Sequence, residues 1–319
     1  MLKYIKNKES LLTMNNLQAI ISNYLSFCQD QKRLDRKTIK AYKIDLSQFT
    51  HFHSNDFFKS IDSKSIESFI ILLHQTYKPK TVKRKIASIK AFFHYMEYKE
   101  VIHINPFNKI QIKFREPINL PKIIPMNTLQ NFFATLYKQK ELAPTIYQKK
   151  CILRDIGVIE LLFATGIRIS ELCSLKPDNF DFIENNILIY GKGSKERRVQ
   201  IGNKDVMLAL KEYHMNFKEE IEFSQYFFVN RINSRLSEQS VRNMINKYSS
   251  LAEIKLHITP HMFRHSFATY LLEEDVDIRY IQEILGHSSI NITEIYTHVT
   301  LAKQKNILTQ KHPRNTMVF

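Results

Sequence analysis

The chain has 319 residues, enough for two domains, and its 44% hydrophobic content favours folded cores over global disorder. It contains no apolar run near the ~20 residues that cross a bilayer, and its first residues lack the apolar stretch of a signal peptide. The three cysteines form no CxxC pair, which excludes a disulfide scaffold and indicates reduced thiols. We therefore expect a cytoplasmic protein with no membrane partner.

The formal net charge of +16 is unevenly distributed along the chain. Residues 1–124 contain 22 Lys and Arg against 10 Asp and Glu, whereas residues 125–319 contain 25 against 21. This asymmetry predicts that the amino-terminal part binds a polyanion, with nucleic acid as the favoured candidate. The alternative is a surface charge that only keeps the protein soluble.

Residues 1–14 are expected to form a flexible arm, and residues 15–100 a bundle of four helices. Apolar residues recur there at spacings of three and four, which is typical of amphipathic helices with short connections. The four helices are expected to begin near Asn15, Arg36, Ser65 and Pro79.

Basic residues gather at the start of the second and fourth of these helices. Positive charges at a helix amino terminus oppose the helix dipole, so helix stability does not explain them. Contacts with backbone phosphates would explain them, although an ordinary solvated face is the alternative. The candidate DNA-contacting residues are Arg36, Lys37, Lys40, Lys80, Lys83 and Arg84.

Residues 101–125 contain four prolines and little periodicity, which indicates a linker before a second domain at 126–319. Asn127 or Thr128 is expected to cap the first helix of this domain. The largely apolar segment 151–163 predicts a buried helix, which Gly166 should end just before Arg168. Alone, Arg168 is weak evidence for a catalytic site, because an arginine beside an apolar run is usually a paired structural residue.

Residues 187–190 and 197–201 are predicted to form a β-hairpin with Lys192 at its tip. An exposed lysine at a turn is common, so this position alone does not indicate catalysis. The Gly-Lys-Gly turn is followed by a strand rather than a helix, which excludes a phosphate-binding P-loop.

Near the carboxyl terminus, Thr259 and Pro260 predict the start of a helix. His261 and Arg264 would then share its first turn, where backbone N–H groups and the helix dipole favour an anion. His261 and His265 have metal-ligand spacing, but the motif lacks the glutamate of HExxH and Arg264 would repel a cation. We therefore expect neither a metal nor a cofactor.

Cleavage of a phosphodiester requires a nucleophile, neutralisation of the phosphate charge and a proton for the leaving oxygen. Tyr296 is the candidate nucleophile, and Lys192 on its turn is the candidate proton donor. Arg168 and Arg264 could each bind two phosphate oxygens through the guanidinium group. His261 could accept the tyrosine proton or contact the phosphate, and His287 could also contact the phosphate.

Four motifs resemble those of the tyrosine recombinases, the lambda-integrase family. They are ATGIRISEL (164–172), IYGKGSKERRVQI (189–201), TPHMFRHSFATYLL (259–272) and LGHSSINITEIYTHV (285–299). The spacing is also similar, with 24 residues from Arg168 to Lys192 and 23 from Arg264 to His287. The compact layout is most similar to the Xer subgroup and to short integrases of mobile elements.

The resemblance implies a mainly α fold with a small antiparallel β-sheet, in which a SAM-like core-binding domain precedes the catalytic domain. It implies a site-specific recombinase that cuts and rejoins duplex DNA through a covalent 3′-phosphotyrosine, as a tetramer in the synapse. The implied catalytic set is Arg168, Lys192, His261, Arg264, His287 and Tyr296, with Glu171 in support. Lys192 would be the general acid for the leaving 5′-oxygen.

The sequence departs from the family pattern at Asp275, where many relatives have glycine, and at Gln200, where proline is common. Aspartate tolerates a left-handed backbone, so we expect the turn at Asp275 to be retained. Two alternative functions stay open: relaxation of DNA in the manner of a type IB topoisomerase, and DNA binding by a non-catalytic regulator. The sequence does not separate chromosome-dimer resolution from integration and excision, nor decide whether a second recombinase takes part.

Overall fold

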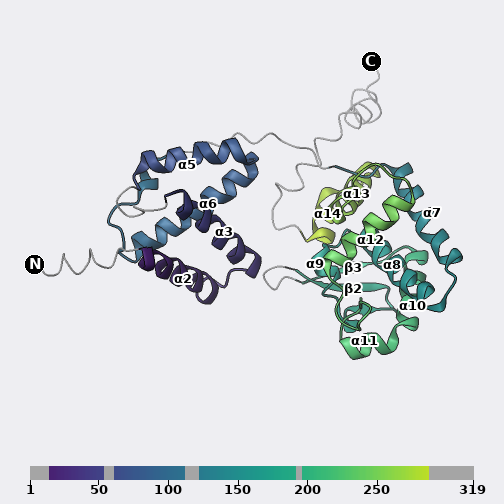
Figure 1. The fold of residues 1–319 in the computed structure, drawn as a ribbon. Coiled ribbons are helices and arrows are strands. Elements are labelled where there is room, and N and C mark those ends of the chain that lie inside the picture. Colours follow the sequence, from purple (N-terminus) through teal and green to yellow (C-terminus); the bar gives the residue numbers. More distant parts are fainter. Residues whose placement is uncertain (1–13, 54–60, 112–121, 192–195, 287–319) are drawn as a thin grey trace, which may run out of the picture. The chain divides into compact units, whose positions relative to one another are not determined.

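A computed structural model describes residues 14–53, 61–111, 122–191 and 196–286 of the chain (Figure 1). The chain divides into two compact units, Met1–Ile118 and Asn119–Phe319, called here the first and second units. Within the described ranges, no helix is long and apolar enough to cross a membrane.

The first unit contains the four predicted helices, which surround a single hydrophobic core. These helices are α2 (Met14–Asp30), α3 (Arg36–Phe52), α5 (Ser63–Thr76) and α6 (Pro79–Tyr98). Tyr24, Phe49 and Phe92 are fully buried at the centre of this core. The amphipathic spacing in the sequence therefore identified the inward face of each helix.

Three of these helices begin at residues that satisfy the usual rules for helix starts. The Asp35 carboxylate accepts a hydrogen bond from the Lys37 backbone N–H at 2.6 Å, and the Asp62 carboxylate accepts one from Ser65 N–H at 2.8 Å. Helix α6 begins with Pro79, whose missing N–H costs nothing in the first turn.

Part of the expected linker belongs to the first core. Residues Pro106–Lys109 form a 3₁₀ turn, η1, in which Phe107 is buried against Phe93. The hydroxyl of Ser63 donates to the Pro106 carbonyl at 3.0 Å and joins this turn to α5. The prolines of this segment are therefore compatible with a packed turn. The lack of hydrophobic periodicity in the sequence did not indicate that this turn would form.

The second unit is larger and mainly helical, with helices packed around α8 and a small sheet at one side (Figure 1). Its long helices are α7 (Met126–Leu142), α8 (Ile146–Thr165), α10 (Lys204–Asn216), α12 (Glu238–Leu251) and α13 (Pro260–Glu273). Its short elements are α9 (Ile169–Leu172), η2 (Pro177–Asn179), α11 (Lys218–Ser224) and α14 (Ile278–Leu285). The helix predicted over 151–163 is the buried part of α8.

The sheet consists of β1 (Phe180–Asp181), β2 (Asn186–Tyr190) and β3 (Glu196–Gln200), all antiparallel. In the β2–β3 hairpin, Ile189 pairs with Arg197 and Tyr190 with Glu196. The predicted hairpin is confirmed, with each strand starting one residue earlier than expected.

The start of α7 differs from the prediction. The cap is Pro125 rather than Asn127 or Thr128, and the helix begins at Met126. The Pro125 carbonyl accepts the first helical hydrogen bond from Leu129 N–H at 3.0 Å. A proline can hold the extended backbone of a cap position, so a polar side chain was not required there.

Candidate active site

The turn between α8 and α9 depends on glycine at position 166. Gly166 has a φ of 58°, in the left-handed region, and ends α8 as predicted. A Cβ atom there would lie 2.7 Å from both Leu285 Cδ2 and Phe267 Cδ1. The turn at this position therefore requires glycine, which has no Cβ atom. Arg168 follows two residues later.

Arg264 joins this turn to the end of α14. Its guanidinium donates to the Gly166 carbonyl and to the Leu285 carbonyl, each at 2.7 Å, and the residue is only 4% exposed. Arg264 lies in the first turns of α13, which begins at the predicted cap, Thr259. A buried guanidinium with two backbone acceptors is held rigidly, because any movement would leave a carbonyl unsatisfied.

Arg168 is the amino-terminal cap of α9 and contacts Glu171 twice. Its backbone N–H donates to Glu171 Oε2 at 3.1 Å, and its Nη1 donates to Glu171 Oε1 at 2.8 Å. Its Nη2 donates to the Gly286 carbonyl at 3.3 Å. The Arg168 side chain is 35% exposed, so it is anchored and still open to an incoming group.

Glu171 accepts from a second arginine, Arg197, which lies on β3. Arg197 Nη2 donates to Glu171 Oε2 at 2.8 Å and Nη1 donates to Oε1 at 3.3 Å. Burial alone would raise the pKa of Glu171, but the hydrogen bonds and charge of Arg197, together with hydrogen bonds from Arg168, outweigh it and lower the pKa. Glu171 is therefore an anion that fixes two guanidinium groups.

His261 lies in the first turn of α13 and is open to solvent on one side while the rest of its side chain is partly desolvated. Desolvation lowers its pKa, and the positive charges of Arg264, Arg242 and Arg168 lower it further. Arg242 belongs to α12 and pairs with Glu238 at 3.1 Å. The imidazole is therefore neutral at physiological pH and can accept a proton or a hydrogen bond.

His265, the other histidine of the motif, is more strongly perturbed. Burial lowers its pKa to about 4, and the neighbouring His261 and Arg264 act in the same direction. A metal cation bound to His261 and His265 would be repelled by the positive charge of Arg264. Across the described residues, no group of three or more His, Cys, Asp or Glu side chains is arranged to hold a metal ion.

The structure thus brings together the described members of the predicted site. Arg168, Glu171 and Arg264 meet around the end of α14, and His261 lies within range of the charges of Arg168 and Arg264. Lys192, His287 and Tyr296 lie outside the described residues.

Arg197 is a contact that the sequence reasoning missed. The alternation of side chains along β3 indicates only that Arg197 shares a face with Val199, which points into the core. An arginine on the inward face of a strand requires a partner, and Glu171 supplies it.

The six basic residues predicted to contact DNA are all exposed. Arg36, Lys40 and Lys80 are exposed. Arg84 forms an ion pair with Asp45 while its side chain remains 46% exposed. Lys37 and Lys83 are also exposed, on α3 and α6 respectively.

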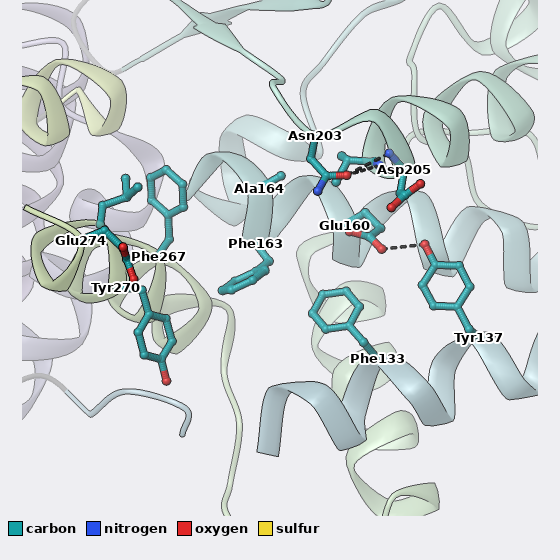
Figure 2. Close-up of a pocket in the computed structure, with 12 residues that line it drawn as sticks. Phe133, Tyr137, Glu160, Phe163, Ala164, Asn203, Asp205, Phe267, Tyr270 and Glu274 are labelled. Carbon is teal, nitrogen blue, oxygen red and sulfur yellow. Dashed lines mark hydrogen bonds between the residues drawn. The ribbon is translucent and has the colours of Figure 1, made fainter. Parts of the chain in front are cut away.

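A cavity of about 480 Å³ lies elsewhere in the second unit (Figure 2). Aromatic side chains such as Phe133 and Tyr270 line it, together with Glu160, which accepts a hydrogen bond from Tyr137 at 2.6 Å. Burial raises the pKa of Glu160 despite this hydrogen bond. Arg168, Arg197 and Arg264 do not line it, but Phe267, which lies beside Gly166, does.

Two family models match the chain, one for each unit. Residues 21–100 match the phage integrase N-terminal SAM-like domain, and residues 133–303 match the phage integrase family. A tyrosine recombinase of Agathobacter rectalis is 61% identical over 306 residues, covering 96% of this chain and all of the relative. The chain belongs to the phage integrase family of tyrosine recombinases. A XerC tyrosine recombinase of Thermodesulfovibrio yellowstonii is 34% identical and covers 94% of this chain and 98% of its own length.

Solved structures of tyrosine recombinases share this fold. A XerH recombinase bound to a palindromic difH substrate superposes with a TM-score of 0.73 at 23% identity, covering 91% of this chain and 84% of that one. A lambda integrase dimer bound to a core site superposes at 0.66 with 16% identity, over 88% and 94%. The predicted fold class, mainly helical with a small antiparallel sheet, is confirmed.

This tyrosine recombinase also keeps the turn that the sequence placed at Asp275. The residue has a φ of 64°, in the left-handed region. The expectation that aspartate would retain the turn is therefore confirmed. In the next helix, Asp277 caps α14 by accepting from Arg279 N–H at 2.7 Å, and Gly286 ends it.

Proposed function

We propose that this tyrosine recombinase cuts and rejoins duplex DNA at a specific site through a covalent 3′-phosphotyrosine on Tyr296. The observation that carries the proposal is the position of Arg168 and Arg264 around the α8–α9 turn, beside neutral His261. Two fixed guanidinium groups suit the non-bridging oxygens of a phosphodiester and can replace metal ions in neutralising their charge.

In the proposed reaction, the Tyr296 hydroxyl oxygen attacks the phosphorus and the bond to the 5′-oxygen breaks. His261 accepts the tyrosine proton, and Lys192 protonates the leaving 5′-oxygen. Arg168, Arg264 and His287 stabilise the charge on the phosphate during the transfer. The phosphotyrosine conserves the energy of the broken bond, so rejoining needs no ATP.

The proposed partner is duplex DNA. The exposed basic residues of α3 and α6, among them Arg36, Lys40 and Lys80, would contact the backbone phosphates and position the protein. A lambda integrase tetramer bound to a Holliday junction has the same fold, which supports a tetrameric synapse for this protein as well. The three unpaired cysteines support action in the cytoplasm.

The experiment that tests the proposal is covalent capture on a nicked suicide duplex. The site would first be selected from a library of randomised duplexes by binding to the protein. We expect the wild-type protein to form a covalent adduct and Tyr296→Phe to form none while still binding the duplex. Failure of the wild-type protein to form an adduct, or equal adduct formation by Tyr296→Phe, would refute the catalytic role.

The same preparation separates the alternative functions. A type IB topoisomerase would relax a supercoiled plasmid that lacks the selected site, whereas a site-specific recombinase would leave it supercoiled. A non-catalytic regulator would keep its biological activity as Tyr296→Phe.

A further inference from the structure

Arg197 joins three separate segments of the second unit. Its guanidinium holds Glu171 on α9 through two hydrogen bonds, of 2.8 and 3.3 Å, and its Nε donates to the Ile284 carbonyl on α14 at 2.8 Å. It also packs on Gly286, where a Cβ atom would lie 3.0 Å from Arg197 Nη1. The side chain is only 10% exposed, so these contacts are shielded from water.

The other two segments have anchors of their own. Arg168 keeps Glu171 through its backbone N–H and its Nη1, and Arg264 holds the end of α14 through the Leu285 carbonyl. Strand β3 is joined to α9 and α14 through Arg197. Without the Arg197 side chain, β3 would keep its pairing with β2 but lose these hydrogen bonds to α9 and α14. Arg168 and α14 would each keep an anchor of their own.

Arg197 is the second residue of β3, the strand that follows the hairpin turn, and it pairs with Ile189 on β2. Lys192 lies five positions earlier in the sequence. We propose that Arg197 is a positioning residue that fixes the base of the β2–β3 hairpin against Glu171 and α14, and thereby sets where Lys192 delivers its proton. This inference rests on the proposed function, in which Lys192 protonates the leaving 5′-oxygen.

A substrate with sulfur in place of the bridging 5′-oxygen separates this role from a merely structural one. A thiolate leaves without being protonated, so cleavage of the sulfur substrate does not need the general acid. An active site that has lost only the position of its proton donor will therefore cleave the sulfur substrate normally and the oxygen substrate slowly.

The experiment compares single-turnover cleavage of oxygen and sulfur suicide duplexes by wild type and Arg197→Gln. We expect Arg197→Gln to lose about 10- to 100-fold on the oxygen duplex, in line with a catalytic group displaced by about an ångström, and about threefold or less on the sulfur duplex. The ratio of the two rates within one preparation does not depend on how much of the protein is folded.

Arg198→Gln is the matched control, because Arg198 is the next residue of β3, pairs with Leu188 and is exposed. It removes the same charge and should leave the sulfur-to-oxygen ratio at the wild-type value. Arg197→Lys, which keeps the charge but cannot make the two-pronged contact, should shift the ratio in the same direction as Arg197→Gln.

Equal losses of Arg197→Gln on the two substrates, or no loss on either, would overturn the positioning role. A wild-type protein that forms no adduct on either duplex would instead refute the proposed function. The two failures are therefore distinguishable in one set of reactions.

Discussion

The Arg264 guanidinium donates to the Gly166 carbonyl at 2.7 Å, across 98 positions of the sequence. Gly166 exposes this carbonyl because α8 ends there in a left-handed turn. The same arginine holds the last turn of α14 through the Leu285 carbonyl. One buried side chain thus determines where both the α8–α9 turn and the end of α14 lie.

Substitution of Gly166 by alanine tests the steric requirement at this turn. Gly166→Ala places a Cβ 2.7 Å from the side chains of Leu285 and Phe267 at a positive φ, so we expect a loss of at least about 1–2 kcal/mol in the free energy of unfolding. Gly202→Ala is the control, since nothing lies within 4 Å of its Cβ. Urea denaturation measures both, and equal stabilities would contradict the steric account.

Replacement of Arg264 by lysine tests whether the guanidinium shape matters beyond its charge. Lysine cannot reach both carbonyls in the same plane, so one buried acceptor loses its partner at a cost of about 1–3 kcal/mol. The proposed contact with the phosphate would also lose the guanidinium geometry, and we expect cleavage of the suicide duplex to fall by about 10²-fold or more. Cleavage at the wild-type rate by a stably folded Arg264→Lys protein would exclude this role.

Local signals in the sequence predicted most of the fold. Thr259 and Gly166 were predicted as helix boundaries from the chemistry of single residues, and the structure confirms both. Arg197 and its partner Glu171 are separated by 26 positions, and no local pattern reveals that they meet. Contacts of this kind follow from the packing of distant segments, which the sequence alone did not show.

The sequence predicted the environment of the basic cluster at residues 78–85 only in part. Its composition indicated a solvated, phosphate-facing surface, and Lys80 and Lys83 are indeed exposed. Lys85, in contrast, is 3% exposed and donates to Asp45 at 3.0 Å. Its helical position, three residues after buried Val82, was the available signal that it faces inward.

The dependence of DNA affinity on salt tests the predicted phosphate contacts of the first unit. Each lysine or arginine that neutralises a phosphate contributes about 0.9 to the slope of log affinity against log salt concentration. We expect Arg36→Gln and Lys40→Gln each to reduce the slope by about that amount. Lys99→Gln, at the opposite end of α6 from Lys80, is the control, and an equal reduction by it would contradict specific contacts.

The low pKa of His265 predicts a loss of stability in mild acid. Burial lowers the pKa of this histidine in the folded protein to about 4, whereas an unfolded histidine has a pKa of about 6.5. Between these values the unfolded chain binds the proton and the folded chain does not. The contribution of His265 to the free energy of unfolding is therefore complete above pH 6.5 and declines as the pH falls toward 4.

Measurement of unfolding free energy at pH 7 and pH 5 checks this dependence. His265→Gln removes the titrating group, so the difference between the two pH values should be smaller in the variant than in the wild-type protein. Identical differences would show that His265 does not contribute to acid sensitivity.

Substitution of Asp45 should destabilise the first unit. Its side chain is fully buried and accepts from Lys85 Nζ at 3.0 Å, from Ser88 Oγ at 2.9 Å and from Arg84 Nη2 at 3.0 Å. Asp45→Asn leaves the buried Lys85 ammonium without its anion, and we expect a loss of about 3–5 kcal/mol. Amide hydrogen exchange in the core of α6 reports this loss for the first unit separately from the second.

Two further variants distinguish a buried charge defect from a simple loss of contacts. Arg84→Gln removes a partner whose side chain is 46% exposed, so its cost should stay within about 1 kcal/mol. Adding Lys85→Met to Asp45→Asn removes the unpaired ammonium and should restore part of the lost protection. The opposite outcome is that the amide hydrogens of α6 exchange as fast in the double variant as in Asp45→Asn alone. That result would show that the defect arises from the lost hydrogen bonds to Ser88 and Arg84 and not from an uncompensated charge on Lys85.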